Sequence, residues 1–182
     1  MLIGVSGKIG SGKDTVVQII QALYPQYPWE VRRFATKVKQ VVALLTNTTE
    51  EQNCSRTGKQ IVPRGFTQSL GSLQQCVGMA LRQHIDENVW VTATMTDIAD
   101  KYILVPDVRF PNELGVILER GVCLRIEGDP EQVRKLDARD LLHPSETALD
   151  FYPFSNIVHN NGTKDELQKN IATLLENILG LK

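Results

Sequence analysis

A glycine-rich segment near the start of the chain is the first candidate for chemistry. Residues 7–15 read Gly-Lys-Ile-Gly-Ser-Gly-Lys-Asp-Thr and follow the apolar run 2–5. Glycine lets successive backbone N–H groups turn toward one phosphate, and the positive end of the next helix faces the same anion. Lys13 adds a full charge that reaches the β- and γ-phosphates. The segment predicts a nucleotide-phosphate site made by Lys8, Gly10, Ser11, Gly12, Lys13, Asp14 and Thr15.

The residue after Lys13 departs from the commonest form of this motif, in which a Ser or Thr hydroxyl helps to hold Mg²⁺. Asp14 stands there instead, and Thr15 follows it. GTPases and motor ATPases need that hydroxyl, so the sequence favours another class of nucleotide-binding protein. We expect Thr15 and Asp14 to help hold Mg²⁺. The alternative for Asp14 is an acid in the first turn of a helix that the helix dipole alone favours.

A second polar group follows the apolar run Tyr102–Pro106, which we predict to be a strand. Asp107 can orient metal-bound water or bind a ligand hydroxyl. Arg109 offers a planar guanidinium that suits a phosphate, and Glu113 adds another acid. The alternative is an internal salt bridge between Asp107 and Arg109 that only shapes the loop.

Two further groups of polar residues have a functional and a structural interpretation. The predicted helix Leu70–Leu81 carries Gln74 and Gln75, which either read a base edge or lie on a solvated face, and Arg82 follows them. Four cations after the second predicted strand either hold an acceptor phosphate or form only a charged surface: Arg32, Arg33, Lys37 and Lys39.

A charged segment in the second half of the chain is a candidate lid over roughly residues 127–145. It carries Arg134 and Arg139, which could close over the phosphates as mobile lids do, or belong to an ordinary surface helix. His143 invites a role as general base, but a phosphate acceptor is already anionic near neutral pH and needs none. We expect Ser145 and Glu146 to begin or cap a short helix.

The composition indicates one globular domain. The chain has 182 residues, a hydrophobic fraction of 42% and a net charge of −1, so it offers no basic surplus for coating nucleic acid. No apolar stretch is long enough to span a bilayer, and we expect no signal peptide. Three widely spaced cysteines lack metal-ligand spacing and fit reduced thiols in a cytoplasm: Cys54, Cys76 and Cys123. The expected partners are therefore small molecules, with no nucleic acid and no membrane.

Strand and helix patterns alternate along the chain, which predicts an α/β fold with a mostly parallel sheet and helices on both faces. The expected strands are Leu2–Ser6, Glu30–Ala35, Tyr102–Pro106, Val122–Ile126 and Asn156–His159. We expect a polar loop at 46–68 and a final helix that begins with a capping box at Thr163 and Glu166. Since ligands of such sheets bind at the carboxyl ends of strands, the polar segments after the first, third and last strands should form one cleft. The apolar stripes of the helix at 70–81 and of the final helix fit either a monomer or a homodimer.

Several of these segments together resemble the deoxynucleoside monophosphate kinases of tailed bacteriophages and their bacterial relatives. The matching pieces run in order along most of the chain: residues 7–15, 34–39, the Gln74-Gln75…Gly78…Arg82 stretch with Trp90 beyond it, 107–114, 143–146 and 160–163. The Gly-Lys-X-Thr ending likewise resembles the nucleoside monophosphate kinase group. The resemblance implies a three-layer P-loop fold of that group with five strands and a small lid, located in the cytoplasm, or in the host cytoplasm for a phage protein.

The resemblance also implies ATP as donor, Mg²⁺, and a deoxynucleoside monophosphate as acceptor. It implies that Asn160 and Gly162 lie near the donor adenine. The acceptor region is expected over roughly residues 32–90 together with the end of the third strand, and its contacts are expected to come from Phe34, Lys37 or Lys39, Arg64, Gln75, Arg82, Trp90, Asp107, Arg109 and Glu113. Arg56 is a further candidate in the polar loop. The expected catalytic residues are Lys13, Arg109 and an arginine of the lid, Arg139 or Arg134.

Two other readings remain open. One is a P-loop kinase for another small phosphorylated acceptor, such as dephospho-coenzyme A or phosphomevalonate. The other is a nucleotide-dependent switch, which would bind ATP or GTP tightly and have no acceptor. Release of ADP that does not depend on an acceptor would favour the switch.

Overall fold

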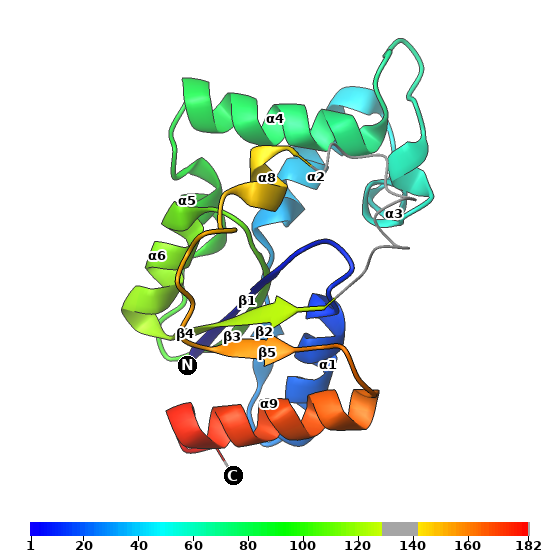
Figure 1. The fold of residues 1–182 in the computed structure, drawn as a ribbon. Helices are drawn as coiled ribbons and strands as arrows, with labels where there is room; N and C mark the ends of the chain where they lie inside the picture. Colours follow the sequence, from blue (N-terminus) through cyan, green and yellow to red (C-terminus); the bar gives the residue numbers. More distant parts are fainter. Residues whose placement is uncertain (129–141, 182) are drawn as a thin grey trace.

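The computed structural model describes residues 1–128 and 142–181, and its centre is a parallel sheet (Figure 1). The five strands lie in the order β2-β3-β1-β4-β5, and each neighbouring pair is parallel. Ile3 in the central strand is level with Leu104 on one side and with Val122 on the other. The strands are β1 (Leu2–Gly7), β2 (Trp29–Val31), β3 (Tyr102–Val108), β4 (Val122–Glu127) and β5 (Ile157–His159).

Helices α1 (Lys13–Leu23) and α9 (Lys164–Leu179) cover one face of the sheet (Figure 1). Side chains of a strand alternate between its two faces, so Ile3 and Val5 of β1 both point toward these helices. They join one buried cluster with Ile20 of α1 and Ile171 of α9. The capping box predicted at the start of α9 is present, with Thr163 as its first residue.

Helices α5 (Val89–Thr94) and α6 (Pro111–Arg120) cover the other face. Leu2 and Val105 point into this second cluster, where they meet Ile117 of α6. Gly4 lies on the same face, and a Cβ there would be 2.8 Å from Ile117. The α6 helix can therefore pack closely on the centre of the sheet.

A helical region lies beyond the carboxyl ends of the strands, and α4 runs across it in Figure 1. Its elements are α2 (Phe34–Thr46), α3 (Glu50–Cys54), the 3₁₀ helix η1 (Gly58–Gln60), α4 (Leu70–His84) and α8 (Pro144–Thr147). The short α8 confirms the helix expected at Ser145 and Glu146. Among the described residues, no helix is both long and apolar enough to cross a membrane.

The structure confirms the predicted fold class and corrects two boundaries. A five-stranded parallel sheet carries helices on both faces, and the glycine-rich loop joins β1 to α1. The strand expected at Glu30–Ala35 ends at Val31, because α2 begins at Phe34. The expected loop at 46–68 contains α3, whose first amides are capped by Thr49 and Gln52 at 3.2 and 2.9 Å. Arg134, Arg139 and most of the expected lid lie outside the described residues.

Candidate active site

The loop of residues 7–15, here called the P-loop, has the backbone that binds phosphate in other proteins. Gly7, Gly10 and Gly12 adopt φ values of 154°, 75° and 97°. Gly12 is the N-cap of α1 and offers no side chain to cap it, so the first amides of α1 remain for an anion. Only glycine suits this position, because a Cβ on Gly12 would lie 2.5 Å from Nδ2 of Asn160.

The ammonium group of Lys13 folds back over its own loop. Nζ donates hydrogen bonds to the carbonyl oxygens of Gly7 at 2.8 Å and of Lys8 at 2.7 Å. A full positive charge is thereby held beside the free amides of α1. This combination of amides, helix dipole and ammonium favours a multiply charged phosphate.

Two side chains join the P-loop to distant parts of the chain. Asn160, just after β5, donates from Nδ2 to the carbonyl oxygen of Ser11 at 2.9 Å. Lys8 donates to the carbonyl oxygen of Glu146 at 2.8 Å and pairs with Asp150. These contacts hold the loop in place against β5 and the α8 region. The ammonium of Lys8 is directed to that region, and Gly162 lies in the exposed turn before α9.

Asp14 and Thr15 stand in the first turn of α1. Asp14 is 75% exposed, and its Oδ1 lies 2.7 Å from Nη2 of Arg33. Thr15 is half-buried beside it. Within residues 1–128 and 142–181 no group of three His, Cys, Asp or Glu side chains could hold a metal ion without other ligands. Any Mg²⁺ here would therefore take most of its ligands from phosphate and water, as Mg²⁺ commonly does.

The carboxyl end of β3 contains an irregularity that positions Asp107. Gly4 and Ser6 of β1 pair with Val105 and Val108, so β3 has one extra residue between them, next to Pro106, which has no N–H to donate. The carboxylate of Asp107 accepts hydrogen bonds from the amides of Phe34 at 3.0 Å and Ala35 at 2.8 Å. Asp107 therefore caps α2 and does not form the alternative salt bridge with Arg109. This capping contact decides where α2 begins.

Arg109 and Arg82 each pair with a buried carboxylate. Arg109 pairs with Glu146, which is 3% exposed, and donates to the carbonyl oxygen of Ser145 at 2.9 Å. Arg82 pairs with Glu113, which is 2% exposed, and its guanidinium carbon lies 4.1 Å from the centre of the Phe110 ring. Both guanidinium groups are thus held in fixed positions at the carboxyl edge of the sheet.

Burial and charge perturb the pKa values of this network. Burial raises the pKa of Glu113 to about 7, although Arg82 and the amides of Arg109 and Phe110 favour its ionised form. Burial by itself lowers the pKa of Arg109, but the neighbouring carboxylates, first of all Glu146, outweigh it and leave that pKa raised. Arg109 therefore stays charged, while Glu113 can take up a proton near neutral pH.

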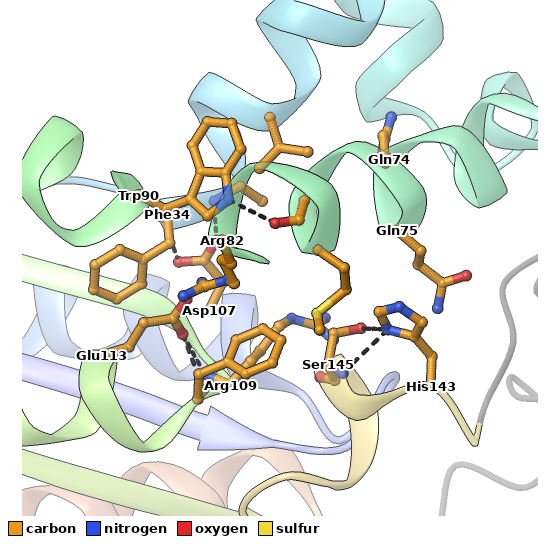
Figure 2. Close-up of a pocket in the computed structure, with 15 residues that line it drawn as sticks. Phe34, Gln74, Gln75, Arg82, Trp90, Asp107, Arg109, Glu113, His143 and Ser145 are labelled. Atoms are coloured by element: carbon orange, nitrogen blue, oxygen red, sulfur yellow. Dashed lines mark hydrogen bonds and ion pairs between the residues drawn. The ribbon is translucent and has the colours of Figure 1, made fainter. Parts of the chain in front are cut away.

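A small apolar pocket of about 100 Å³ lies between α2, α4, α5 and α8. Figure 2 shows Trp90 and Phe34 at one end and Gln75 and His143 at the other. The indole Nε1 of Trp90 donates to the carbonyl oxygen of Gly78 at 2.9 Å, which fixes the ring. The lining also includes Arg82, Arg109, Asp107, Glu113, Met79 and Ser145.

A larger cleft of about 690 Å³ lies next to this pocket and reaches the P-loop. The two cavities share Ala35, Gln74, Asp107 and Arg109, so they meet at the carboxyl end of β3. Among the residues that the structure describes, six cations line the cleft, namely Lys13, Arg33, Lys39, Arg56, Lys59 and Arg109, against the three carboxylates of Asp14, Glu50 and Asp107. This cleft, called here the P-loop cleft, is electropositive and suits polyanions.

The structure separates the predicted site residues into two groups. Lys39 lines the P-loop cleft, whereas Lys37, two positions earlier on α2, lines a different cavity. Arg64 is exposed in the turn after η1 and lines none of these cavities. The apolar pocket is lined by seven of the residues that the sequence assigned to the acceptor: Phe34, Gln75, Arg82, Trp90, Asp107, Arg109 and Glu113.

Sequence reasoning missed part of the lining. Lys59 received no role, although it stands in the same polar loop as Arg56. Ser145 is predicted only to begin or cap a short helix, and His143 is assigned no role, but both line the apolar pocket. His143 Nδ1 accepts a hydrogen bond from the amide of Ser145 at 3.1 Å and lies 3.0 Å from its hydroxyl. A histidine before a Pro-Ser-Glu sequence is the signal for this cap.

No protein-family model matches the chain, and no curated protein matches its sequence. Solved structures that resemble it include a shikimate kinase from Aquifex aeolicus vf5, with 17% identity, 97% coverage of both chains and a TM-score of 0.47. A sugar kinase from Janibacter sp. HTCC2649 has 12% identity, 98% and 96% coverage, and a TM-score of 0.46. TT1252 from Thermus thermophilus has 17% identity, 99% and 98% coverage, and a TM-score of 0.45. At this level of similarity, the function has to be argued from the site itself.

Proposed function

We propose that this protein is a P-loop kinase that transfers a phosphoryl group from ATP to a deoxynucleoside monophosphate, giving ADP and a deoxynucleoside diphosphate. The observation that carries the proposal is the junction of the two cavities at Asp107 and Arg109. One cavity is apolar and lies between side chains of α2 and α4. The other is electropositive and includes the P-loop. An acceptor nucleotide across the junction would direct its phosphate toward the P-loop.

The donor side of the cleft fits the triphosphate of ATP. The amides at the start of α1, which the side chain of the N-cap residue Gly12 cannot cap, lie beside the ammonium of Lys13. A nucleotide there would replace the carbonyl oxygens of Gly7 and Lys8 as partners of that ammonium. Asn160, which contacts the P-loop backbone, would then stand beside the donor nucleotide.

Aromatic, polar and cationic side chains would bind the acceptor nucleotide. Phe34 and Trp90 are the aromatic rings at one end of the pocket, and stacking on aromatic rings would tolerate several bases. Gln75 and Ser145 offer hydrogen-bonding groups at the other end of the pocket. Arg109 lies between both cavities and would orient the acceptor phosphate, since a guanidinium suits phosphate oxygens.

Magnesium fits the first turn of α1. The exposed carboxylate of Asp14 and the hydroxyl of Thr15 are hard oxygen donors, which Mg²⁺ prefers. These two residues would hold the ion together with phosphate oxygens and water. When bound, the ion would neutralise charge on the phosphates.

The residues of the cleft would act by position and charge. The acceptor is a phosphate oxygen that is already anionic, so the reaction requires no general base from His143. Lys13 would follow the transferring group, and Arg109 would hold the acceptor in line with it. Such positioning and charge stabilisation account for most of the catalysis in phosphoryl transfer.

An acceptor panel tests the proposal. ADP release is coupled to a spectroscopic assay with dGMP, dTMP, dCMP, dAMP and their ribose counterparts, and with dephospho-coenzyme A and phosphomevalonate. We expect turnover that requires at least one deoxynucleoside monophosphate. Turnover only with dephospho-coenzyme A or phosphomevalonate would assign the protein to another kinase class. ADP release that no acceptor accelerates would contradict a kinase and favour a nucleotide switch.

A further inference from the structure

A third cavity, of about 340 Å³, lies beside the first turns of α2 and the end of α5. We call it the basic hollow and define it by Arg32, Arg33, Lys37, Thr94, Asp97 and Lys101. Its volume falls within the range of roughly 300–1,000 Å³ that small-molecule sites occupy. The proposed kinase reaction uses none of these residues except Arg33.

Positive charge dominates the basic hollow. Four cations line it, whereas Asp97 is its one carboxylate among the described residues. Glu30, which stands nearby, offsets part of this charge by pairing with Arg32 at 2.6 Å and with Lys101 at 3.4 Å. Lys37 has no ion pair in the described part of the chain, so its charge stays available.

One wall of the hollow is held in place by Arg32, and a buried hydroxyl lies within this wall. Arg32 donates from Nη1 to the carbonyl oxygen of Thr94 at 3.0 Å and to that of Thr96, so it holds the end of α5. Thr94 is 8% exposed, and its hydroxyl makes no hydrogen bond within the residues that the structure describes. Buried polar groups are nearly always satisfied, and one that is not requires an explanation.

We propose that the basic hollow is a second anion site, which binds a small phosphorylated molecule and is separate from the nucleotide cleft. The cations attract the phosphate, and the end of α5, which Arg32 holds in place, forms one wall. Lys37 on α2 and Lys101 before β3 approach the hollow from two elements. The proposal of an anion site does not depend on whether the nucleotide cleft carries out the proposed reaction.

Arg33 links the basic hollow to the P-loop. It lines both cavities, and its Nη2 lies 2.7 Å from Oδ1 of Asp14. Because the guanidinium is shared, an anion in the hollow competes with Asp14 for it. The carboxylate of Asp14, next to Lys13, then loses its cationic partner and, in the absence of Mg²⁺, repels nucleotide phosphates. Such coupling is reciprocal, so a nucleotide at the P-loop weakens the anion in the hollow as well.

Pyrophosphate is a suitable probe of the site. The amide signals of Lys37 and Thr94 are followed by ¹H–¹⁵N NMR while inorganic pyrophosphate is added to the protein with a fixed excess of adenylyl imidodiphosphate. We expect shifts that saturate. Lys37→Glu should weaken this binding by about tenfold or more, since it replaces one attractive charge by a repulsive one. Lys169→Glu on the exposed face of α9 makes the same charge change far from the hollow and should leave it unaltered.

Two results would overturn the site: signals of Thr94 that do not saturate, or equal weakening by Lys37→Glu and Lys169→Glu. The coupling has its own test, the affinity for adenylyl imidodiphosphate with and without pyrophosphate, measured without Mg²⁺. Pyrophosphate can also compete directly with adenylyl imidodiphosphate at the P-loop, and this competition affects the wild type and Lys37→Glu equally. The wild type should lose about fivefold more affinity than Lys37→Glu does, a value at the low end of measured couplings. Equal losses would disprove the coupling through Arg33.

Discussion

Arg109 and Glu146 form a buried ion pair that joins the carboxyl end of β3 to α8. Glu146 is 3% exposed and Arg109 19%. Arg109 also donates to the carbonyl oxygen of Ser145. The guanidinium that we assign to the acceptor phosphate is therefore held in place before any ligand arrives. This order reduces the entropy lost when the acceptor binds.

Glu146→Gln should destabilise the protein, because it leaves the charge of Arg109 buried without a partner. Loss of one member of a buried pair costs about 3–5 kcal/mol. Urea denaturation measures the free energy of unfolding. Asp14→Asn breaks the exposed pair with Arg33 and is the matched control, expected to cost less than about 1 kcal/mol. Equal effects of the two substitutions would show that burial of the Arg109 pair has no energetic consequence.

Lys13→Ala should lower turnover by about 10³-fold or more while the fold survives. The ammonium donates to the carbonyl oxygens of Gly7 and Lys8, and the half-buried Lys13 side chain belongs to neither buried apolar cluster, so its removal takes no core packing away. It does remove the charge that would offset the transferring phosphoryl group, a kind of contribution that reaches about 10³–10⁵ in related chemistry. Steady-state kinetics measures the loss of turnover, and thermal denaturation checks that the fold survives. Near-normal turnover in this variant would refute the role of the P-loop.

Lys39 and Lys37 offer a matched comparison on one helix. Lys39→Ala should raise the KM for the acceptor by about tenfold or more, since a hydrogen bond to a charged group contributes about 1.5–3 kcal/mol. Lys37→Ala should leave KM unchanged in the absence of other anions, because Lys37 lines the basic hollow instead of the P-loop cleft. A larger effect of Lys37→Ala would reverse this assignment. Initial rates across acceptor concentrations decide between them.

The sequence predicted those parts of the fold that local patterns encode. Short apolar runs between helical patterns located the strands, and the capping box at Thr163 located α9. The error at β2 came from a contact that no local pattern shows. Asp107 caps α2 from more than seventy positions away, and this starts a helix where the run Arg32–Ala35 had indicated a strand. The small helix α3 was missed, although Thr49 and Gln52 carry its capping signal.

The site could be predicted in outline and not in its pairings. Strand ends brought the P-loop, Asp107 and Asn160 to one edge, as parallel topology requires. The partners of Arg109 and Arg82 could not be read from the sequence, because each ion pair joins residues more than thirty positions apart. Lys37 and Lys39 differ by two positions on a helix, so they point in nearly opposite directions. Only the packing of α2 decides which of them faces the cleft.

Gly12→Ala should weaken nucleotide binding and cost stability. Gly12 has φ 97°, a conformation that costs other residues about 1–2 kcal/mol, and the new Cβ would lie 2.5 Å from the amide of Asn160. Gly115→Ala is the matched control, since Gly115 is exposed on α6 and a Cβ there meets nothing within 4 Å. That control should stabilise the protein by about 0.5–1 kcal/mol. Thermal denaturation and nucleotide titration measure both variants, and unchanged nucleotide affinity in Gly12→Ala would contradict the loop geometry.

The stability of the protein should depend on pH through Glu113. Burial raises the pKa of its carboxyl to about 7 in the folded protein, compared with the ordinary 4.5. Between these values the unfolded chain has released the proton and the folded chain retains it. The free energy of unfolding therefore falls as the pH rises through this window, by about 3 kcal/mol at most, and levels off above it. Urea denaturation from pH 4.5 to 8 should show this fall in the wild type and not in Glu113→Gln. The difference in the free energy of unfolding between wild type and Glu113→Gln could instead stay constant or grow with pH. The carboxyl of Glu113 would then be ionised throughout, and its ion pair with Arg82 would persist at every pH.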